Sequence, residues 1–381
     1  MIAGINRLLD GLVRPEVPLL GRARPAFQVC GFAGLVVAAA LTEGLTWQLG
    51  LEPWIGGALV VAGALGFLAV AVLGKAVTGS ASLVFYRQAL AVLAAATGTL
   101  VALDRPVLPY LDVSALAVMG FLACGRVGCL MVGCCHGKPA AVGVRYRRAH
   151  AIFGFSPHLV GVRLFPTQAI EAVAALALTA GGVTALVIAA PAPGVVMTAL
   201  AVGYALARFL LEIARGDRFR PILAGFSEAQ WISIATVTAV VVLAARGWVP
   251  ARPWQVGALV AVAALLGFIA AWRYLGQAPR HRLLHPGHIH EVATALAELP
   301  ARTQPGTITT ATTSLGICMS VSSIADAGGP IAHVTISHRD GGLPEENARV
   351  IVDLVCDLHP DHPRHELVSG RLGVFHLLFH P

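Results

Sequence analysis

Long apolar runs dominate the first 275 residues of the chain. A helix that crosses a bilayer needs about 20 mostly apolar residues, because the hydrocarbon layer offers backbone groups no hydrogen-bond partners except one another. Eight stretches meet this requirement: residues 27–49, 54–77, 83–103, 112–133, 167–190, 194–215, 228–246 and 253–273. The pattern predicts an all-α polytopic membrane bundle, with about eight transmembrane helices.

A different pattern begins near residue 276, where no apolar run is long enough to span a membrane. Residues 314–324, 331–338 and 372–380 alternate like strands, and residues 290–302 and 345–358 have helical periodicity, with Pro300 expected to end the first helix. The tail is therefore predicted to be a small soluble α+β domain of unknown role. We divide the chain into an N-terminal segment (1–26), a membrane-embedded domain (27–275), a His-rich linker (276–290) and the soluble domain (291–381).

Composition agrees with this division. Of all residues, 56% are hydrophobic and only 12% are charged, which excludes a disordered chain and a wholly soluble one. Residues 1–275 hold 20 Lys and Arg against 10 Asp and Glu, whereas the tail holds 7 against 10. An acidic tail and a basic membrane part argue against a nucleic-acid partner.

Seven cysteines, an odd number, do not form a disulfide framework, and four of them crowd together at Cys124, Cys129, Cys134 and Cys135. A spacing of five residues rotates a helical side chain by about 500°, so the first three cannot face one point if the helix continues. We therefore expect no metal site and no cofactor. Two alternatives to simple packing of small thiols stay open: a site formed by Cys134, Cys135 and His136 beyond the helix, or a reactive thiol.

Ionisable residues at membrane depth are costly and usually face a cavity or one another. Arg126 lies in the fourth predicted span, and Arg208, Glu212 and Arg215 share one face of the sixth. One interpretation is structural: an Arg208–Glu212 pair with Arg215 at the membrane surface. The other is an anion pocket, because guanidinium stays charged in a low dielectric and offers a planar fork of donors to phosphate. We assign Arg126 and Arg208 to such a pocket.

Three stretches carry a family resemblance: GRVGCLMVGCCHGKP at 125–139, RLFPTQAIEA at 163–172 and YALARFLLEIARGD at 204–217. Together they resemble the bacterial prolipoprotein diacylglyceryl transferase family, over roughly residues 27–246. The resemblance implies a multi-pass enzyme of the bacterial inner (plasma) membrane. It implies transfer of the diacylglyceryl group of phosphatidylglycerol to the cysteine thiol of a prolipoprotein lipobox, with release of glycerol phosphate. The expected partners are this anionic phospholipid, the lipobox peptide and the membrane.

The resemblance also implies roles for individual residues. Arg126 and Arg208 match the family's essential arginines and are expected to be catalytic, because two shielded guanidinium groups can neutralise a departing phosphate. The expected substrate-binding residues are Gly125, Gly137, Gln168, Glu171, Glu212 and Arg215.

The chain departs from the family pattern at two places. Cys129, Val132 and Cys134 stand where the family has Asn, Asn and Glu, and Tyr86-Arg87-Gln88 align with its His-Gly-Gly. A replacement base is then needed to take the proton of the acceptor thiol, whose free pKa is about 8.5. His136 and Tyr86 are the candidates for this catalytic role.

These departures leave three functional hypotheses. The first is the diacylglyceryl transferase itself. The second is a catalytically silent relative that binds anionic lipid and presents its tail to a partner. The third is a membrane enzyme in which Cys129, Cys134 or Cys135 forms a covalent intermediate.

Orientation follows from two arguments that disagree. Lys and Arg are concentrated in residues 1–26 and in the loop after the fourth span, and the positive-inside rule would place that face in the cytoplasm. The family resemblance implies the opposite, with its signature outside the cytoplasm where the prolipoprotein arrives. We follow the resemblance, because arginines that form a site do not report topology. With eight spans the tail is then extracytoplasmic, whereas seven would place it in the cytoplasm.

Overall fold

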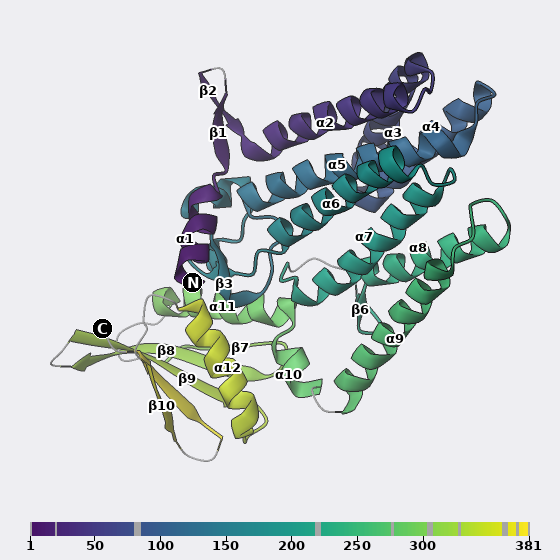
Figure 1. Cartoon of the computed structure of the whole chain (residues 1–381). Helices are drawn as coiled ribbons and strands as arrows, with labels where there is room; N and C mark the ends of the chain where they lie inside the picture. Colours follow the sequence, from purple (N-terminus) through teal and green to yellow (C-terminus); the bar gives the residue numbers. More distant parts are fainter. Residues whose placement is uncertain are drawn as a thin grey trace.

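The computed structural model describes residues 2–19, 21–79, 85–217, 222–275, 278–302, 308–326, 329–359, 365–370 and 373–379. Within these ranges, eight helices are long and apolar enough to cross a membrane, which confirms the predicted all-α bundle. They are α2 (Ala26–Gln48), α3 (Pro53–Thr78), α4 (Phe85–Ala102), α5 (Val107–Val132), α6 (Thr167–Thr184, continued by a π-turn over Ala185–Ala189), α7 (Val195–Ala214), α8 (Glu228–Ala245) and α9 (Pro253–Leu275). They run side by side as one bundle (Figure 1).

Helix α5 is the central helix of this bundle. Buried residues make up 67% of its most apolar stretch, against 22% for α2, α3, α6, α8 and α9. It begins at Val107, earlier than the predicted start at residue 112, because Asp112 is buried inside the helix and does not mark its end. The Asp112 carboxylate accepts backbone hydrogen bonds from Gly194 (2.7 Å) and Met197 (2.6 Å) at the start of α7. A negative charge is favourable there, since the N-terminus of a helix carries free N–H donors.

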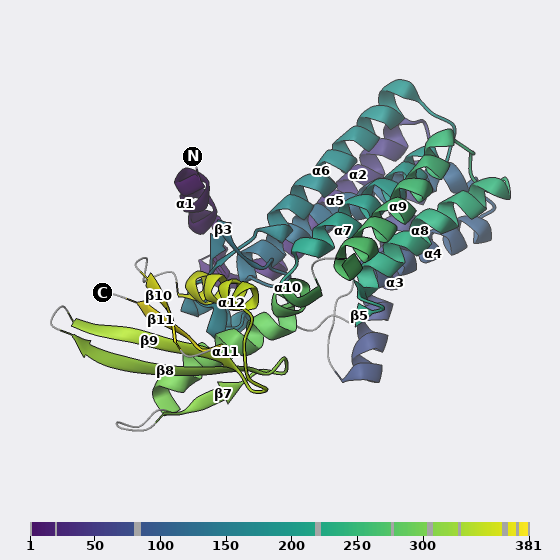
Figure 2. The ribbon, with the colours of Figure 1, turned by 90° about the horizontal axis from the view of Figure 1, so that it is seen from below.

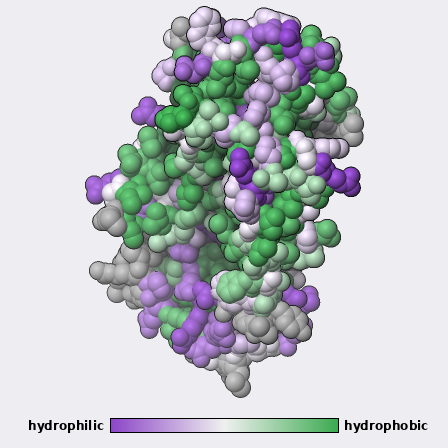
Figure 3. All heavy atoms as spheres, turned by 45° about the vertical axis from the view of Figure 1, so that its right-hand side comes forward, coloured by the Kyte–Doolittle hydropathy of each residue, from purple (hydrophilic) through white to green (hydrophobic). Residues whose placement is uncertain are grey.

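The outer surface of the bundle matches its expected solvent. Exposed leucine, valine, phenylalanine and tryptophan side chains cover the outward faces of α2, α3, α6 and α9. Figure 3 shows these apolar residues in green over the helical part and hydrophilic residues gathered toward the lower end of the view. The structure is that of a multi-pass membrane protein.

A compact layer of loops covers one end of the bundle. It contains the strands β3 (Pro139–Arg145) and β4 (Arg163–Leu164) and the 3₁₀ turns η1 (Arg148–Phe153) and η2 (Pro157–Leu159), all between α5 and α6. The N-terminal helix α1 (Ile2–Leu12) lies against β3, where Asp10 pairs with Arg163 (2.9 Å). Two short hairpins complete the membrane part: β1 (Glu16–Leu19) with β2 (Arg22–Pro25), and β5 (Ile222–Leu223) with β6 (Phe226–Ser227).

The tail forms the predicted α+β unit. In its described part, an antiparallel sheet has the strand order β10-β11-β9-β8-β7, and one face is covered by α11 (Pro286–Arg302) and α12 (Glu345–Leu358) (Figure 2). The strands are β7 (Thr310–Thr312), β8 (Ile317–Asp326), β9 (Gly329–His338), β10 (His365–Ser369) and β11 (Phe375–Phe379). Alternation places Met319, Val334, Ile336 and Leu377 against the helices, while His333 and His376 lie on the other face. The three strands and two helices expected from the sequence are confirmed.

The predicted His-rich linker is largely helical. It contains α10 (Ala278–Leu283) and the first turns of α11, and α11 continues through Pro300, where it was expected to end. The His288 side chain is buried, with Nδ1 2.7 Å from the Leu283 carbonyl oxygen and Nε2 3.0 Å from Thr313 Oγ1. The sequence has a second histidine-rich stretch at residues 359–365. It lies mostly outside the described residues, since 360–364 are not described.

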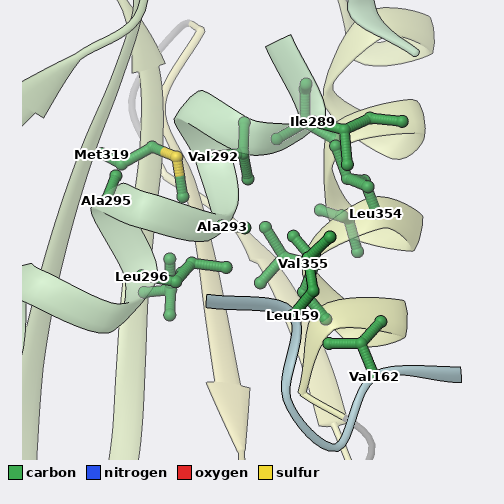
Figure 4. Close-up of a cluster of buried hydrophobic side chains, with 14 of the residues drawn as sticks. Leu159, Val162, Ile289, Val292, Ala293, Ala295, Leu296, Met319, Leu354 and Val355 are labelled. Carbon is green, nitrogen blue, oxygen red and sulfur yellow. The ribbon is translucent and has the colours of Figure 1, made fainter. Parts of the chain in front are cut away.

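The tail and the loop layer share one hydrophobic core. Leu159 and Val162 of the loop layer are 1% and 2% exposed, and they lie beside Leu354 and Val355 of α12 (Figure 4). With eight crossing helices, the N-terminal segment and the tail also lie on the same side as this layer. The tail is therefore docked on the loops between α5 and α6.

Candidate functional site

The ends of α5, α6 and α7 are tied together by residues 133–138. Helix α5 ends at Gly133, which adopts a left-handed conformation (φ 85°), and the chain then passes between Phe165 and the end of α7. Gly137 donates to the Phe165 carbonyl oxygen (3.0 Å) and pairs with Arg215 as an isolated β-bridge. A Cβ atom at position 137 would lie 2.5 Å from that carbonyl oxygen. Glycine is therefore required for the close approach of these segments, which explains the expected importance of Gly137 in steric terms.

Arg126 and Arg208 meet on one carboxylate in the bundle. Arg126 Nε lies 3.1 Å from Glu171 Oε2, and Arg208 Nη1 lies 3.5 Å from the same oxygen. Arg208 Nη2 also pairs with Glu212 Oε2 at 2.8 Å, as the spacing of four residues on α7 predicts. The side chains of all four are at most 13% exposed. Three helices thus bring two arginines and two glutamates into one desolvated network.

Tyr204 completes this network and was missed by the sequence analysis. Its hydroxyl donates to Glu171 Oε1 at 2.7 Å, and its ring packs edge-on against Phe85, with the ring centroids 5.4 Å apart. A signal was present, because Tyr204 precedes Arg208 by four residues and therefore lies on the same face of α7. Glu171 therefore forms ion pairs with two arginines through Oε2 and accepts a hydrogen bond from Tyr204 at Oε1.

Gln168 fixes the loop instead of lining the arginine pair. Its Nε2 donates to the Cys134 carbonyl oxygen at 2.6 Å, and the neighbouring Thr167 hydroxyl donates to that of Cys135 at 2.8 Å. Thr167 and Gln168 at the start of α6 thus hold the loop, and Glu171, one turn later on the same helix, pairs with the arginines. Gln168 Oε1 has no hydrogen-bond partner among the described residues.

A comparison with known protein families gives a match for the membrane part of the chain. Residues 78–246 match the model of the family described as prolipoprotein diacylglyceryl transferase. This part of the chain, 169 of its 381 residues, is similar to that family. The match contains α4 to α8 with the whole arginine–glutamate network, so it confirms the resemblance seen in the three motifs. No curated protein matches the chain.

Arg215 pairs with Asp217 and also lies within electrostatic reach of Glu212, at the border of the arginine–glutamate network. Its guanidinium makes two hydrogen bonds to the Asp217 carboxylate, both of 2.8 Å. The spacing of seven residues had predicted that Arg215 would share a helix face with Arg208. The helix ends at Ala214, and Arg215 takes an extended conformation that redirects its side chain. Asp217 was not among the expected site residues.

His136 faces the tail of the protein. Its Nδ1 lies 2.9 Å from the Gly137 carbonyl oxygen, and its ring contacts Phe155 and His290 with centroid distances of 5.7 and 6.2 Å. Burial lowers the pKa of His136 below its ordinary value, so the imidazole is neutral at pH 7. These contacts place His136 at the junction between the loop layer and α11.

Tyr86 lies at the start of α4, where its hydroxyl donates to Glu228 at the start of α8. It is close enough to Arg208 for an electrostatic interaction. Gln88 is buried in the same turn, and its Oε1 has no hydrogen-bond partner within the described ranges. Gly125, next to Arg126, has open space where a Cβ would stand, so packing does not explain a glycine there.

Three cysteines of the signature converge in a way that their spacing did not predict. The Sγ atoms of Cys129, Cys134 and Cys135 all lie within 4.8 Å of one another. The earlier argument assumed a continuous helix, whereas α5 ends at Val132 and Cys135 itself has a positive φ of 58°. Cys124 is separate and is the neighbour of Cys30 on α2.

Cys135 has the most unusual surroundings of the three. Hydrogen bonds from the Cys129 and Cys134 thiols, together with the positive charges of Arg215 and Arg126, lower the pKa of Cys135 well below its ordinary value. A thiolate at this position lies within electrostatic reach of the same Arg126 that binds Glu171.

Proposed function

We propose that this transferase-like membrane protein moves the diacylglyceryl group of phosphatidylglycerol to the cysteine thiol of a prolipoprotein lipobox. In this reaction the thiol sulfur forms a bond to the glyceryl carbon, and the bond between that carbon and the phosphate oxygen breaks. The thiol proton leaves through a base, and glycerol phosphate leaves with the electron pair of the broken bond. The family match supports the reaction class.

One observation carries the proposal: Arg126 and Arg208, from different helices, bind the same oxygen of Glu171. A carboxylate oxygen and a phosphate oxygen make similar demands on a guanidinium group. The site therefore already binds an anion of the right kind at the point where both arginines converge. Negative charge that develops on a departing phosphate would be stabilised there by donors that need no rearrangement.

The charges within the network suggest how lipid binding proceeds. Two arginines and two glutamates sum to no net charge, so an added phosphate monoanion leaves an excess negative charge in a desolvated site. That excess favours exchange, with the phosphate replacing Glu171 on the arginines. Arg208 Nη1 pairs with Glu171 Oε2 at 3.5 Å without forming a hydrogen bond, so an incoming phosphate oxygen can replace Glu171 at this donor.

The proton acceptor is proposed from the same geometry. Tyr86 is near Arg208, whereas the contacts of His136 are directed toward Phe155 and His290. Tyr86 is therefore favoured over His136 as the residue that relays the thiol proton: its hydroxyl takes the proton of the thiol and passes its own proton to Glu228. Glu171, released from the arginines by the phosphate, is a second acceptor within the network.

The family resemblance supports an extracytoplasmic site in the bacterial inner membrane. The loop layer and the tail are on one side of eight spans, so the tail shares that side. A prolipoprotein that has crossed the membrane would reach the arginine pair beside the docked tail.

An assay with purified protein tests the proposal. The full chain in nanodiscs that contain phosphatidylglycerol is incubated with a lipobox peptide, and mass spectrometry detects the diacylglyceryl adduct. We expect Arg126→Gln and Arg208→Gln each to lower the rate by about 100- to 1,000-fold, the usual loss for one donor to a developing oxyanion. Arg105→Gln is the control, because Arg105 pairs with Glu52 at a site where both side chains are at least 38% exposed. Equal activity of all three variants and the wild type would contradict the role of the pair.

A second candidate function rests on the position of Cys135 next to Arg126. In this case a cysteine of the chain itself would attack the glyceryl carbon, and an acceptor would then receive the group. Cys135→Ser should abolish the reaction under this hypothesis, and trapped protein should carry a diacylglyceryl mass on Cys135. Under the first proposal Cys135→Ser retains measurable activity and no such adduct forms.

A further inference from the structure

The three-cysteine cluster contains only sulfur ligands. Cys129 lies in the last turn of α5 and is buried, Cys134 is the most accessible of the three, and Cys135 lies between them in exposure. Their Sγ atoms lie within 4.8 Å of one another. Thiols that pack as isolated apolar groups do not need this mutual approach, because each can find separate hydrocarbon neighbours.

The backbone holds the cluster in place. The Gly133 amide closes the end of α5 on the Cys129 carbonyl oxygen (2.9 Å), and α6 holds the carbonyl groups of Cys134 and Cys135 through Gln168 and Thr167. Two of the three sulfurs therefore come from a loop that is fixed at consecutive residues, and the third comes from the central helix. Such prior ordering lowers the entropy cost of binding a ligand between them.

We propose that Cys129, Cys134 and Cys135 form a binding site for one thiophilic d¹⁰ metal ion, Cu(I), in trigonal sulfur coordination. An ion about 2.3 Å from each of three sulfurs requires sulfurs about 4.0 Å apart. The Sγ atoms lie within 4.8 Å of one another, so a contraction of at most about 0.8 Å per pair reaches this value. The site uses none of the residues of the arginine–glutamate network, and it shares only Cys135 with the second candidate function.

The ligand set favours Cu(I) over Zn(II). Structural zinc sites in proteins are almost always four-coordinate, whereas soft thiolates alone suit Cu(I). The adjacent His136 is engaged elsewhere, with Nδ1 at the Gly137 carbonyl oxygen and its ring between Phe155 and His290. The charge also fits, because three thiolates around Cu(I) carry two negative charges close to the guanidinium groups of Arg126 and Arg215.

The test is a metal titration of the reduced full-length protein in detergent under nitrogen. Cu(I) alone is added in competition with a chromophoric Cu(I) chelator, and the protein-bound metal is counted by mass spectrometry. We expect one Cu(I) per chain and an X-ray absorption spectrum with a single sulfur shell at about 2.3 Å. Zn(II), offered in the same way, should bind more weakly.

Variants locate the site. Cys129→Ser, Cys134→Ser and Cys135→Ser should each weaken Cu(I) binding by more than about 100-fold, beyond the usual loss for an outer-shell change. Cys356→Ser is the matched control, because Cys356 lies on α12 of the tail and outside the cluster. Unchanged binding in the three cluster variants, nitrogen or oxygen in the metal shell, or zinc binding as tight as copper would each overturn the proposal.

A measurement on the wild-type chain avoids any folding defect of the variants. Bound Cu(I) should protect Cys129, Cys134 and Cys135 from alkylation by N-ethylmaleimide, while Cys356 reacts at the same rate with and without metal. Alkylation that is indifferent to Cu(I) at the cluster, or a disulfide between two cluster cysteines in the reduced preparation, would also refute the site.

Discussion

Replacement of Glu171 by glutamine is the sharpest test of the buried network. The change keeps the size of the side chain and its ability to accept from Tyr204, but it removes the negative charge that Arg126 and Arg208 share. Arg208 keeps Glu212 at 2.8 Å. Arg126, with a side chain only 9% exposed, keeps no carboxylate partner within the ion pairs of the described chain. Removal of one partner from a buried pair usually costs about 3–5 kcal/mol, and we expect Glu171→Gln to lower the free energy of unfolding by this amount.

The measurement is reversible unfolding by dodecyl sulfate in phosphatidylcholine bicelles, followed by circular dichroism. Glu345→Gln is the matched control, because it breaks the Arg349–Glu345 pair on α12, in which the side chains are 70% and 67% exposed. Exposed pairs of this spacing contribute only about 0.3–0.5 kcal/mol. The double variant Arg126→Gln/Glu171→Gln should recover most of the loss, because it leaves no unpaired charge.

Lipid composition separates a stability role from an anion site. Glu171→Gln gives the network a net charge of about +1, which an anionic headgroup can neutralise where a zwitterionic one cannot. The deficit in unfolding free energy should therefore be smaller in phosphatidylglycerol bicelles than in phosphatidylcholine bicelles. The reasoning is refuted by a loss below about 1 kcal/mol, which would show that the pair is not desolvated, or by a loss that is the same in both lipids.

Three further changes test the surrounding structure, each by the same unfolding measurement. Gly137→Ala should destabilise the protein by about 1–3 kcal/mol, because the new Cβ meets a carbonyl oxygen at 2.5 Å. The control Gly125→Ala, in open space on a helix, should be neutral or stabilising. Equal effects of the two changes would contradict the steric argument. Leu159→Ala should lower the free energy of unfolding by about 2–5 kcal/mol and speed proteolysis of the tail. The control Ile152→Ala, at a side chain that is 84% exposed, should change neither quantity. A tail that stays protected in Leu159→Ala would disprove the shared core. Asp112→Asn should cost about 1–2 kcal/mol through loss of the charge at the start of α7, and an unchanged stability would show that this carboxylate is dispensable.

Local pattern was sufficient for much of this protein. The eight spans were predictable because a bilayer imposes the same length and polarity on every crossing helix, and the strands around Met319, Val334 and Leu377 were predictable from alternation. The pairing of Arg208 with Glu212 also follows from helical spacing alone. Arg126 and Arg208 were selected because charges at membrane depth need partners.

Other features depend on how distant segments pack, and no local pattern specifies them. Sequence spacing placed Arg215 with Arg208, but the end of α7 turned it to Asp217. Cys124 lies apart from Cys129 and Cys134, as the spacing argument expected, but that argument did not predict that Cys135 joins Cys129 and Cys134 beyond the break at Gly133. The linker histidine His288 is buried because it lies between the Leu283 carbonyl group and the Thr313 hydroxyl, a contact with a residue 25 positions away in the chain. The sequence by itself determined a membrane bundle, a soluble tail and the presence of buried charge, since each follows from the polarity of consecutive residues. Only the tertiary structure decided that Glu171 joins the two arginines, that three sulfurs converge and that the tail docks on the loop layer, because these depend on helix ends and crossing contacts.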